Sequence, residues 1–280
     1  MSEQLIGGWS VGNRIPAKRG GPRLAGIALL VASILGCATT PTQTPEDWST
    51  LPPAVDVTPL LWLRADSLSG TVGSPVAGWS ANLGPAVAQS DPDRQPTLAT
   101  LGGRAAVRFD GIDDILEANL NINPSRDTRL TIVAVFSSET DEDSPLRKLY
   151  GHDDGDWDRA AGLDDRAQNG LNYTVFAGPV DQVVGYFKLE TGSAYLTVDQ
   201  FGAGAFDGWV NGHHALQNQR TTHGDGLPTF FIGGTGTVFS EPWQGTVAEL
   251  LVFDDVLLDS QRAALEDFLG RKYALTIGRD

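Results

Sequence analysis

The sequence of 280 residues contains one cysteine, Cys37, and one methionine, Met1. With a single thiol, no disulfide can form within the chain in any compartment. A domain that works outside the cytoplasm without disulfides must depend on its hydrophobic core for stability. Hydrophobic residues make up 41% of the sequence, so a core of that kind can form.

Positive charge is also scarce, with 20 Lys and Arg against 35 Asp and Glu and a formal net charge of −15. The first 36 residues carry +3, so the remainder carries −18. Such an acidic surface repels phosphate groups, which excludes nucleic acid as a partner. The charged residues of the first segment are Glu3, Arg14, Lys18, Arg19 and Arg23.

The longest hydrophobic run covers residues 24–36. A helix that crosses a bilayer needs about 20 residues, so this run is too short to span one. Basic residues precede it, and this combination is typical of a signal peptide. Cys37 follows immediately, and Ile34-Leu35-Gly36-Cys37 resembles the bacterial lipobox, in which the cysteine is acylated and becomes the mature N-terminus.

The sequence therefore predicts a lipoprotein signal peptide over residues 1–36, lipidation of Cys37, a Thr/Pro-rich tether over 37–54 and one domain over 55–280. The predicted location is the bacterial cell envelope. Ala38, rather than Asp, follows the cysteine, and by analogy with Gram-negative sorting this favours the outer membrane. The alternative is an ordinary secretory signal followed by an incidental cysteine.

Short β-type runs separated by Gly, Pro, Asp and Asn fill the domain, and one amphipathic helix with Asp259 as its cap is expected at the end. Asn211-Gly212 predicts a type I′ hairpin. The expected fold is all-β, an antiparallel jelly-roll β-sandwich with one C-terminal helix. Strands are predicted over 60–64, 105–109, 115–118, 130–137, 172–176, 183–189, 194–198, 208–210, 229–232 and 246–253.

A series of short motifs resembles the bacterial laminin G-like, concanavalin A-like modules, over about residues 57–275. The resemblance implies a concanavalin A-like sandwich and leaves function open, because such modules bind glycans, bind proteins or have no known ligand. In order, the motifs are Leu61-Trp-Leu-Arg-Ala-Asp66, Gly78-Trp-Ser80, Gln95-Pro-Thr97, Gly103-Arg-Ala-Ala-Val-Arg-Phe-Asp-Gly111, Val210-Asn-Gly212, Ile232-Gly-Gly234 and Trp243-Gln-Gly-Thr-Val-Ala-Glu-Leu-Leu-Val-Phe253.

An acidic run beginning at His152 is the candidate metal site. Asp154, Asp156 and Asp158 alternate, and Asp165 stands eleven residues after the first of them. Hard carboxylate oxygens are the ligands that Ca²⁺ prefers, so these four residues are predicted as a possible calcium site. The alternative is a solvated acidic loop, since the sixth position lacks the glycine of a calcium loop.

A second acidic motif, Asp110-Gly-Ile-Asp113-Asp114, follows the predicted core residue Phe109. The expected role of its aspartates is to bond the amides of a turn. The alternative is that Asp113 or Asp114 binds a cation.

Trp157 is the candidate sugar-binding aromatic residue, because an exposed ring can stack on a sugar while nearby Asp and Asn bind its hydroxyls. The predicted ligand-binding set is Trp157, Asp156, Asn169 and Asn172. By contrast, three other tryptophans lie in alternating strand patterns and are expected in the core. They are Trp62, Trp209 and Trp243.

No catalytic motif is evident in the sequence. Glycosidases of this superfold use carboxylates spaced along one strand, whereas Glu139-Thr-Asp141-Glu-Asp143 has the composition of a loop. The predicted function is a non-catalytic, envelope-anchored binding module for polysaccharide or glycoconjugate, with Ca²⁺ as a possible cofactor, and not an enzyme. The alternatives are a structural or adhesion module that contacts another envelope protein, and glycoside hydrolysis.

Overall fold

The computed structural model describes residues 46–236 and 241–279. The predicted signal peptide and Cys37 lie outside the described residues. Residues 46–280 form one compact unit. Among the described residues, no helix is long and apolar enough to cross a membrane.

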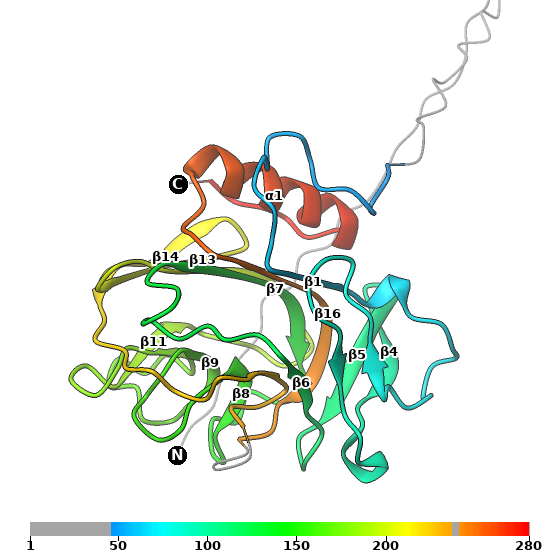
Figure 1. Cartoon of the computed structure of the whole chain (residues 1–280), viewed down its shortest axis with the longest axis horizontal. Coiled ribbons are helices and arrows are strands. Elements are labelled where there is room, and N and C mark those ends of the chain that lie inside the picture. Colours follow the sequence, from blue (N-terminus) through cyan, green and yellow to red (C-terminus); the bar gives the residue numbers. More distant parts are fainter. Residues whose placement is uncertain (1–45, 237–240, 280) are drawn as a thin grey trace, which may run out of the picture. The chain divides into compact units, whose positions relative to one another are not determined.

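Two antiparallel sheets of eight strands each face one another (Figure 1). The first sheet has the order β14-β13-β12-β7-β16-β5-β4, and β1 also pairs with β16. Its strands are β1 (Leu61–Arg64), β4 (Thr97–Leu101), β5 (Arg104–Asp110), β7 (Leu130–Ser138), β12 (Ala194–Phe201), β13 (Ala205–Val210), β14 (His213–Arg220) and β16 (Gln244–Phe253).

The second sheet has the order β11-β10-β9-β8-β15-β6-β3-β2. Two short 3₁₀ helices, η1 (Ala65–Ser67) and η2 (Pro92–Arg94), lie in the connections. The strands of this sheet are β2 (Gly78–Trp79), β3 (Val87–Ala88), β6 (Leu116–Ala118), β8 (Arg147–Gly151), β9 (Ala160–Leu163), β10 (Tyr173–Phe176), β11 (Val183–Phe187) and β15 (Phe230–Ile232).

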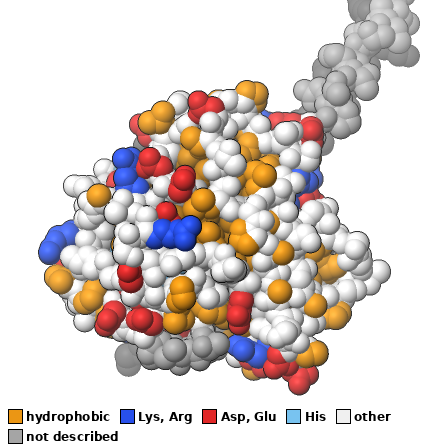
Figure 2. All heavy atoms as spheres, viewed as in Figure 1, with side chains coloured by type: hydrophobic (Ala, Val, Ile, Leu, Met, Phe, Trp, Pro, Cys, Tyr) orange, Lys and Arg blue, Asp and Glu red, His pale blue; other side chains and the backbone are white. Residues whose placement is uncertain are grey.

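Strand β7 shows why the sandwich has two hydrophobic layers. Ile132 and Phe136 point to the core between the sheets, whereas Val133 and Val135 point to the opposite face of the first sheet. Both sets are buried, because the inner set packs on the second sheet and the outer set lies under the C-terminal helix. On the surface seen from the side shown in Figure 1, hydrophobic side chains gather toward the middle and charged side chains lie around them (Figure 2).

The single α-helix of the described chain, α1 (Asp259–Tyr273), covers the outer face of the first sheet (Figure 1). Leu265 and Phe268 pack there. Asp259 is the first helical residue and not the predicted cap. Instead, the backbone N–H of Leu258 donates to the Gln261 side chain at 2.8 Å, so a glutamine one turn further on closes this end.

The segment before β1 belongs to the domain. The Trp48 ring lies 5.3 Å from that of Phe268, and Arg271 donates to Glu46 at 2.7 Å. Leu51 also packs beside the helix. The last part of the predicted tether over 37–54 thus carries an aromatic side chain that contacts an apolar surface on α1, and the predicted boundary at residue 55 stays a prediction.

The antiparallel jelly-roll β-sandwich with one C-terminal helix is confirmed. The hairpin prediction is also confirmed: Asn211 and Gly212 have φ of 47° and 84° and join β13 to β14. All three tryptophans expected in the core are at most 6% exposed, and so is Phe109.

Candidate active site

The outer face of the second sheet carries polar and aromatic side chains beside β8, β9 and β10. Tyr173 and Val175 of β10 point into the core, so the alternate residues Thr174 and Phe176 lie on the opposite face. No helix covers this part of the sheet in the described chain. The face can therefore hold a site open to solvent.

A fully buried lysine, Lys148, lies beneath the exposed side chains of this face. The Nζ of Lys148 donates to Asp164 at 2.8 Å and to Thr174 at 3.3 Å, and it lies 4.1 Å from the Phe176 ring centroid. Arg166 also donates to Asp164, through Nε at 2.7 Å. Burial opposes ionisation of Asp164, but the bonds from Arg166 and Lys148 hold its pKa below the usual value. A buried carboxylate thus fixes two cations beside the same aromatic ring.

A pocket of about 150 Å³ opens above this network. The Trp157 ring meets Phe176 edge to face, with centroids 5.4 Å apart, and the Arg166 guanidinium lies 4.5 Å from the Trp157 ring centroid. We call it the carboxylate pocket; its lining residues are Asp153, Gly155, Trp157, Arg166, Phe176 and Glu241.

The backbone of Trp157 is unusual. Its φ is 62°, in the left-handed region that bulky side chains rarely occupy. Such strain persists only where the surroundings impose it, and it is found most often at functional sites. Here the contacts with Phe176 and Arg166 hold the half-buried ring at the pocket wall.

Two carboxyl groups of the pocket have raised pKa values. Burial raises the pKa of Asp153, and the negative charge of Asp154 adds to the effect. Burial also raises the pKa of Glu241, while Lys148 and Arg166 oppose the rise. The two groups therefore differ: Glu241 lies near two cations that favour its ionised form, and Asp153 does not.

Asp158 lies behind the pocket and is fully buried. Its backbone N–H donates to Asp153 at 2.8 Å, and burial raises the pKa of its own carboxyl to about 7. A carboxyl that is still partly protonated near neutral pH places no full charge next to Asp153. Backbone hydrogen bonds to Asp153 lower its pKa, but burial raises it by more. The pKa of Asp153 therefore lies above its ordinary value.

Of the predicted ligand-binding residues, Trp157 lines the carboxylate pocket and Asp156 is exposed on the same loop without lining it. Asn172 is buried: its amide donates to Leu189 at 3.2 Å and accepts from the Leu189 N–H at 2.7 Å. Asn169 donates to the carbonyl of Gly185 at 3.0 Å. Both asparagines thus hold neighbouring backbone in place. Asn172 is buried and does not face solvent, whereas Asn169 is exposed and its contact with sugar hydroxyls stays a prediction.

The four aspartates predicted for calcium differ in environment. Asp158 is buried, whereas Asp154, Asp156 and Asp165 are exposed. Within residues 46–236 and 241–279, the structure does not gather these four into a group whose ligand atoms lie close together. The acidic loop forms a wall of the carboxylate pocket, and calcium binding stays a prediction.

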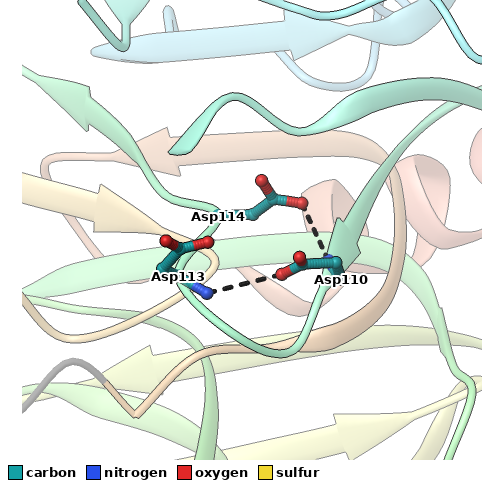
Figure 3. A group of neighbouring side chains, drawn as sticks. All are labelled: Asp110, Asp113 and Asp114. Carbon is teal, nitrogen blue, oxygen red and sulfur yellow. Dashed lines mark hydrogen bonds between the residues drawn. The ribbon is translucent and has the colours of Figure 1, made fainter. Parts of the chain in front are cut away.

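The described residues contain one group of three carboxylates close enough to share an ion: Asp110, Asp113 and Asp114. Figure 3 shows that this group is bonded to its own turn. Asp110 accepts from the N–H of Ile112 at 2.8 Å, and Asp114 accepts from the N–H of Asp110 at 2.9 Å. The predicted structural role of this motif agrees with these bonds.

No model of a protein family matches the chain, and no curated protein matches its sequence. Solved structures do share its fold. A mutant GH54 α-L-arabinofuranosidase soaked with 4-nitrophenyl α-L-arabinofuranoside aligns with a TM-score of 0.53 and 14% identity, over 80% of this chain and 61% of that chain. An arabinofuranosidase complexed with arabinofuranosyl-α-1,2-xylobiose aligns with a TM-score of 0.52 and 12% identity, over 79% and 60%.

A Trypanosoma rangeli sialidase in complex with sialic acid is also similar, with a TM-score of 0.48 and 15% identity, over 79% of this chain. This chain spans 33% of that sialidase and about three fifths of the two arabinofuranosidases. At these identities the comparisons show the fold alone.

The comparisons correct the prediction of a non-catalytic module, because structures named as arabinofuranosidases share the fold of this chain. That prediction rested on the absence of a recognisable catalytic motif, above all of carboxylates spaced along one strand. This ground fails physically. The structure brings Asp153 and Glu241 to one pocket from positions 88 residues apart in the sequence, so a motif within one strand is not required.

Sequence reasoning missed Glu241, Arg166 and Phe176. Glu241 stands outside any acidic run, three residues before β16, and Arg166 follows the predicted calcium loop. The one signal of this pocket in the sequence was that Trp157 stands among several aspartates. The run at Glu139 is a loop after β7, as expected.

Proposed function

We propose that this domain is a glycoside hydrolase that cleaves a glycan at the carboxylate pocket. The observation that carries the proposal is the placing of Asp153 and Glu241, both with raised pKa values, against the Trp157 ring in one pocket. Paired carboxyl groups of unequal environment are what glycosidic cleavage requires. The fold shared with arabinofuranosidases supports a glycan as the substrate class.

In the proposed reaction, protonated Asp153 is the general acid. It gives its proton to the glycosidic oxygen as the bond from that oxygen to the anomeric carbon breaks. Glu241 acts in its ionised form, which Lys148 and Arg166 favour against the burial that raises its pKa; it either attacks the anomeric carbon or takes a proton from the attacking water. Where Glu241 attacks, a water that has lost its proton to Asp153 then breaks the bond between Glu241 and the sugar, so in both cases water supplies the new hydroxyl group. Trp157 binds the apolar face of the sugar ring.

The test is hydrolysis of a panel of 4-nitrophenyl glycosides, beginning with the α-L-arabinofuranoside. We expect Glu241→Gln and Asp153→Asn each to lower kcat by at least about a hundredfold, because each removes a proton-transfer group or nucleophile. Glu190→Gln and Asp254→Asn change exposed carboxylates elsewhere and should leave kcat unchanged. Turnover that survives both pocket substitutions, or no turnover on the whole panel and on polysaccharides, would refute the proposal.

We further propose that the domain belongs to the laminin G-like, concanavalin A-like modules. Most of the motifs that carry this resemblance fall on the first sheet, at β1, β5 and β16 and at the hairpin between β13 and β14, and two fall on β2 and β15 of the second sheet. Their order along the chain supports the proposal.

Export and lipid attachment at Cys37 are likewise proposed, on the grounds of the hydrophobic run over 24–36 and the tetrad that ends at the cysteine. Several acyl chains, each contributing about 0.8 kcal/mol per buried CH₂, would anchor the chain firmly. In a bacterial host, labelled palmitate should enter the wild-type protein and be absent from Cys37→Ala. Equal labelling of the two would contradict lipidation at this residue.

A further inference from the structure

A second pocket adjoins the carboxylate pocket on the same face. It measures about 320 Å³, and its walls are residues 180–185, which include the start of β11, together with Gln168 and Asn169. We call it the side pocket. Arg166 lines both pockets, so the two share one wall.

The architecture of the side pocket depends on Asn169. Its amide donates to the carbonyl of Gly185, and its oxygen accepts from the N–H of Leu171 at 3.2 Å. These bonds fix the 166–171 loop against β11. A Cβ on Gly185 would lie 1.9 Å from the Asn169 oxygen, so this close approach requires glycine. The side pocket is therefore built into the fold and does not depend on a ligand to form.

The lining of the side pocket is polar but offers little charge. Gln168 and Gln182 are exposed amides that can both donate and accept, which suits sugar hydroxyls. The exposed Val180 at the rim provides apolar surface. Asp181 lies 3.9 Å from Arg220, and Arg166 is already paired with Asp164.

The charge around both pockets is negative. The two cations at this face, Lys148 and Arg166, are bonded to Asp164 and leave no positive group free in the described pocket walls. Carboxylates outnumber them in the loop beside the pockets, which would repel an anionic sugar. These carboxylates are Asp154, Asp156, Asp164, Asp165 and Glu241; Asp153 and Asp158 are not among them because burial raises their pKa values.

From these features we propose that the two pockets together bind an uncharged oligosaccharide of at least two sugar units, with one unit in the carboxylate pocket and the next in the side pocket beyond Arg166. This inference rests on the proposed glycoside hydrolase function and adds the size and charge of its substrate. The smaller volume of the carboxylate pocket fits one unit, since pockets for larger ligands usually measure about 300–1,000 Å³.

The experiment compares two substrates with the same glycone. Arabinofuranosyl fluoride has a leaving group too small to reach a second pocket, whereas arabinofuranosyl-α-1,2-xylobiose extends beyond the first. The double variant Gln168→Ala/Gln182→Ala should lower kcat/KM on the oligosaccharide about tenfold, since it removes hydrogen bonds to the second unit, and change that on the fluoride less than twofold. Gln217→Ala, an exposed amide on β14 of the other sheet, is the matched control.

Charge is tested by inhibition. A methyl-esterified tetragalacturonate and the free acid have the same chain and differ in charge, and we expect the ester to inhibit at least tenfold more strongly at low salt, with the difference narrowing as salt rises. Equal inhibition by the free acid would overturn the uncharged substrate class. Turnover of the fluoride with no effect of the double variant on the oligosaccharide would overturn the second unit while leaving the proposed hydrolase function intact. Absence of turnover on both substrates, together with none on the 4-nitrophenyl glycoside panel and on polysaccharides, would refute that function itself.

Discussion

Replacing Glu249 by alanine is expected to lower the free energy of unfolding by about 3–5 kcal/mol, because it removes the buried partner of the Lys272 ammonium group and leaves only the partly exposed Asp66 beside it. Glu249 of β16 lies under α1 and is fully buried. It accepts from Lys272 at 2.6 Å, from the Tyr273 hydroxyl at 2.8 Å and from the Trp62 indole at 2.7 Å. One carboxylate thus joins the helix to two strands of the first sheet. Urea unfolding followed by tryptophan fluorescence measures the change.

The control is the double variant Glu249→Leu/Lys272→Met, which removes both charges and keeps similar volume. We expect it to be more stable than Glu249→Ala, since replacing a whole buried pair by apolar residues costs less than removing one member. The double variant also removes the contact of 3.2 Å between Lys272 and Asp66. Asp66 is partly exposed, so water can solvate its carboxylate in place of the lysine. A double variant as unstable as the single one would show that packing, and not the unpaired charge, causes the effect.

A second large effect is expected from Asp199→Asn, which should make the protein more stable at pH 8 than the wild type and similar to it at pH 4. Asp199 of β12 lies in the core between the sheets, accepts from the Tyr150 hydroxyl at 2.7 Å and has a second oxygen with no partner among the described residues. Burial raises its pKa to about 7. In the unfolded chain the pKa of Asp199 returns to about 3.9, so its carboxyl loses the proton at a lower pH there than in the folded protein.

The contribution of Asp199 to the free energy of unfolding is therefore fully present below about pH 4 and is lost as the pH rises toward about 7. Above about pH 7 this contribution falls no further. The loss is on the order of 4 kcal/mol by linkage. Asparagine has no proton to lose, so this part of the slope should vanish. Asp158 and Asp114, whose pKa values burial raises to about 7 and about 6, leave a residual slope of the same sign. Denaturant midpoints from pH 4 to 8 test the prediction, with Asp254→Asn as the exposed control; parallel curves for wild type and Asp199→Asn would contradict it.

The parts of the fold that the sequence predicts well are those in which local chemistry and final packing agree. Strand β16 is mostly apolar and is buried on both faces, and Asn211-Gly212 can take the positive φ values that a tight hairpin needs. Strands β8 and β9 were missed for the opposite reason. Arg147 and Lys148 suggest a surface, yet both are buried, because their partners come from segments that are distant in the sequence.

The candidate site follows the same rule. Trp157 could be singled out because an aromatic residue within an acidic run is conspicuous. Glu241 could not, since its role depends on lying near Lys148 and Arg166 and in the same pocket as Asp153, none of which is a sequence neighbour. Asn172 was misinterpreted because a buried amide that bonds backbone and an exposed one that bonds sugar have the same sequence appearance.

The packing of Trp48 on α1 also determines on which face of the domain residues 46–55 lie. Residues 46–55 join the domain on the outer face of the first sheet, whereas both pockets open on the outer face of the second. The full thickness of the sandwich therefore separates residues 46–55 from the two pockets, so a change in this segment can alter the packing of α1 without touching either pocket wall.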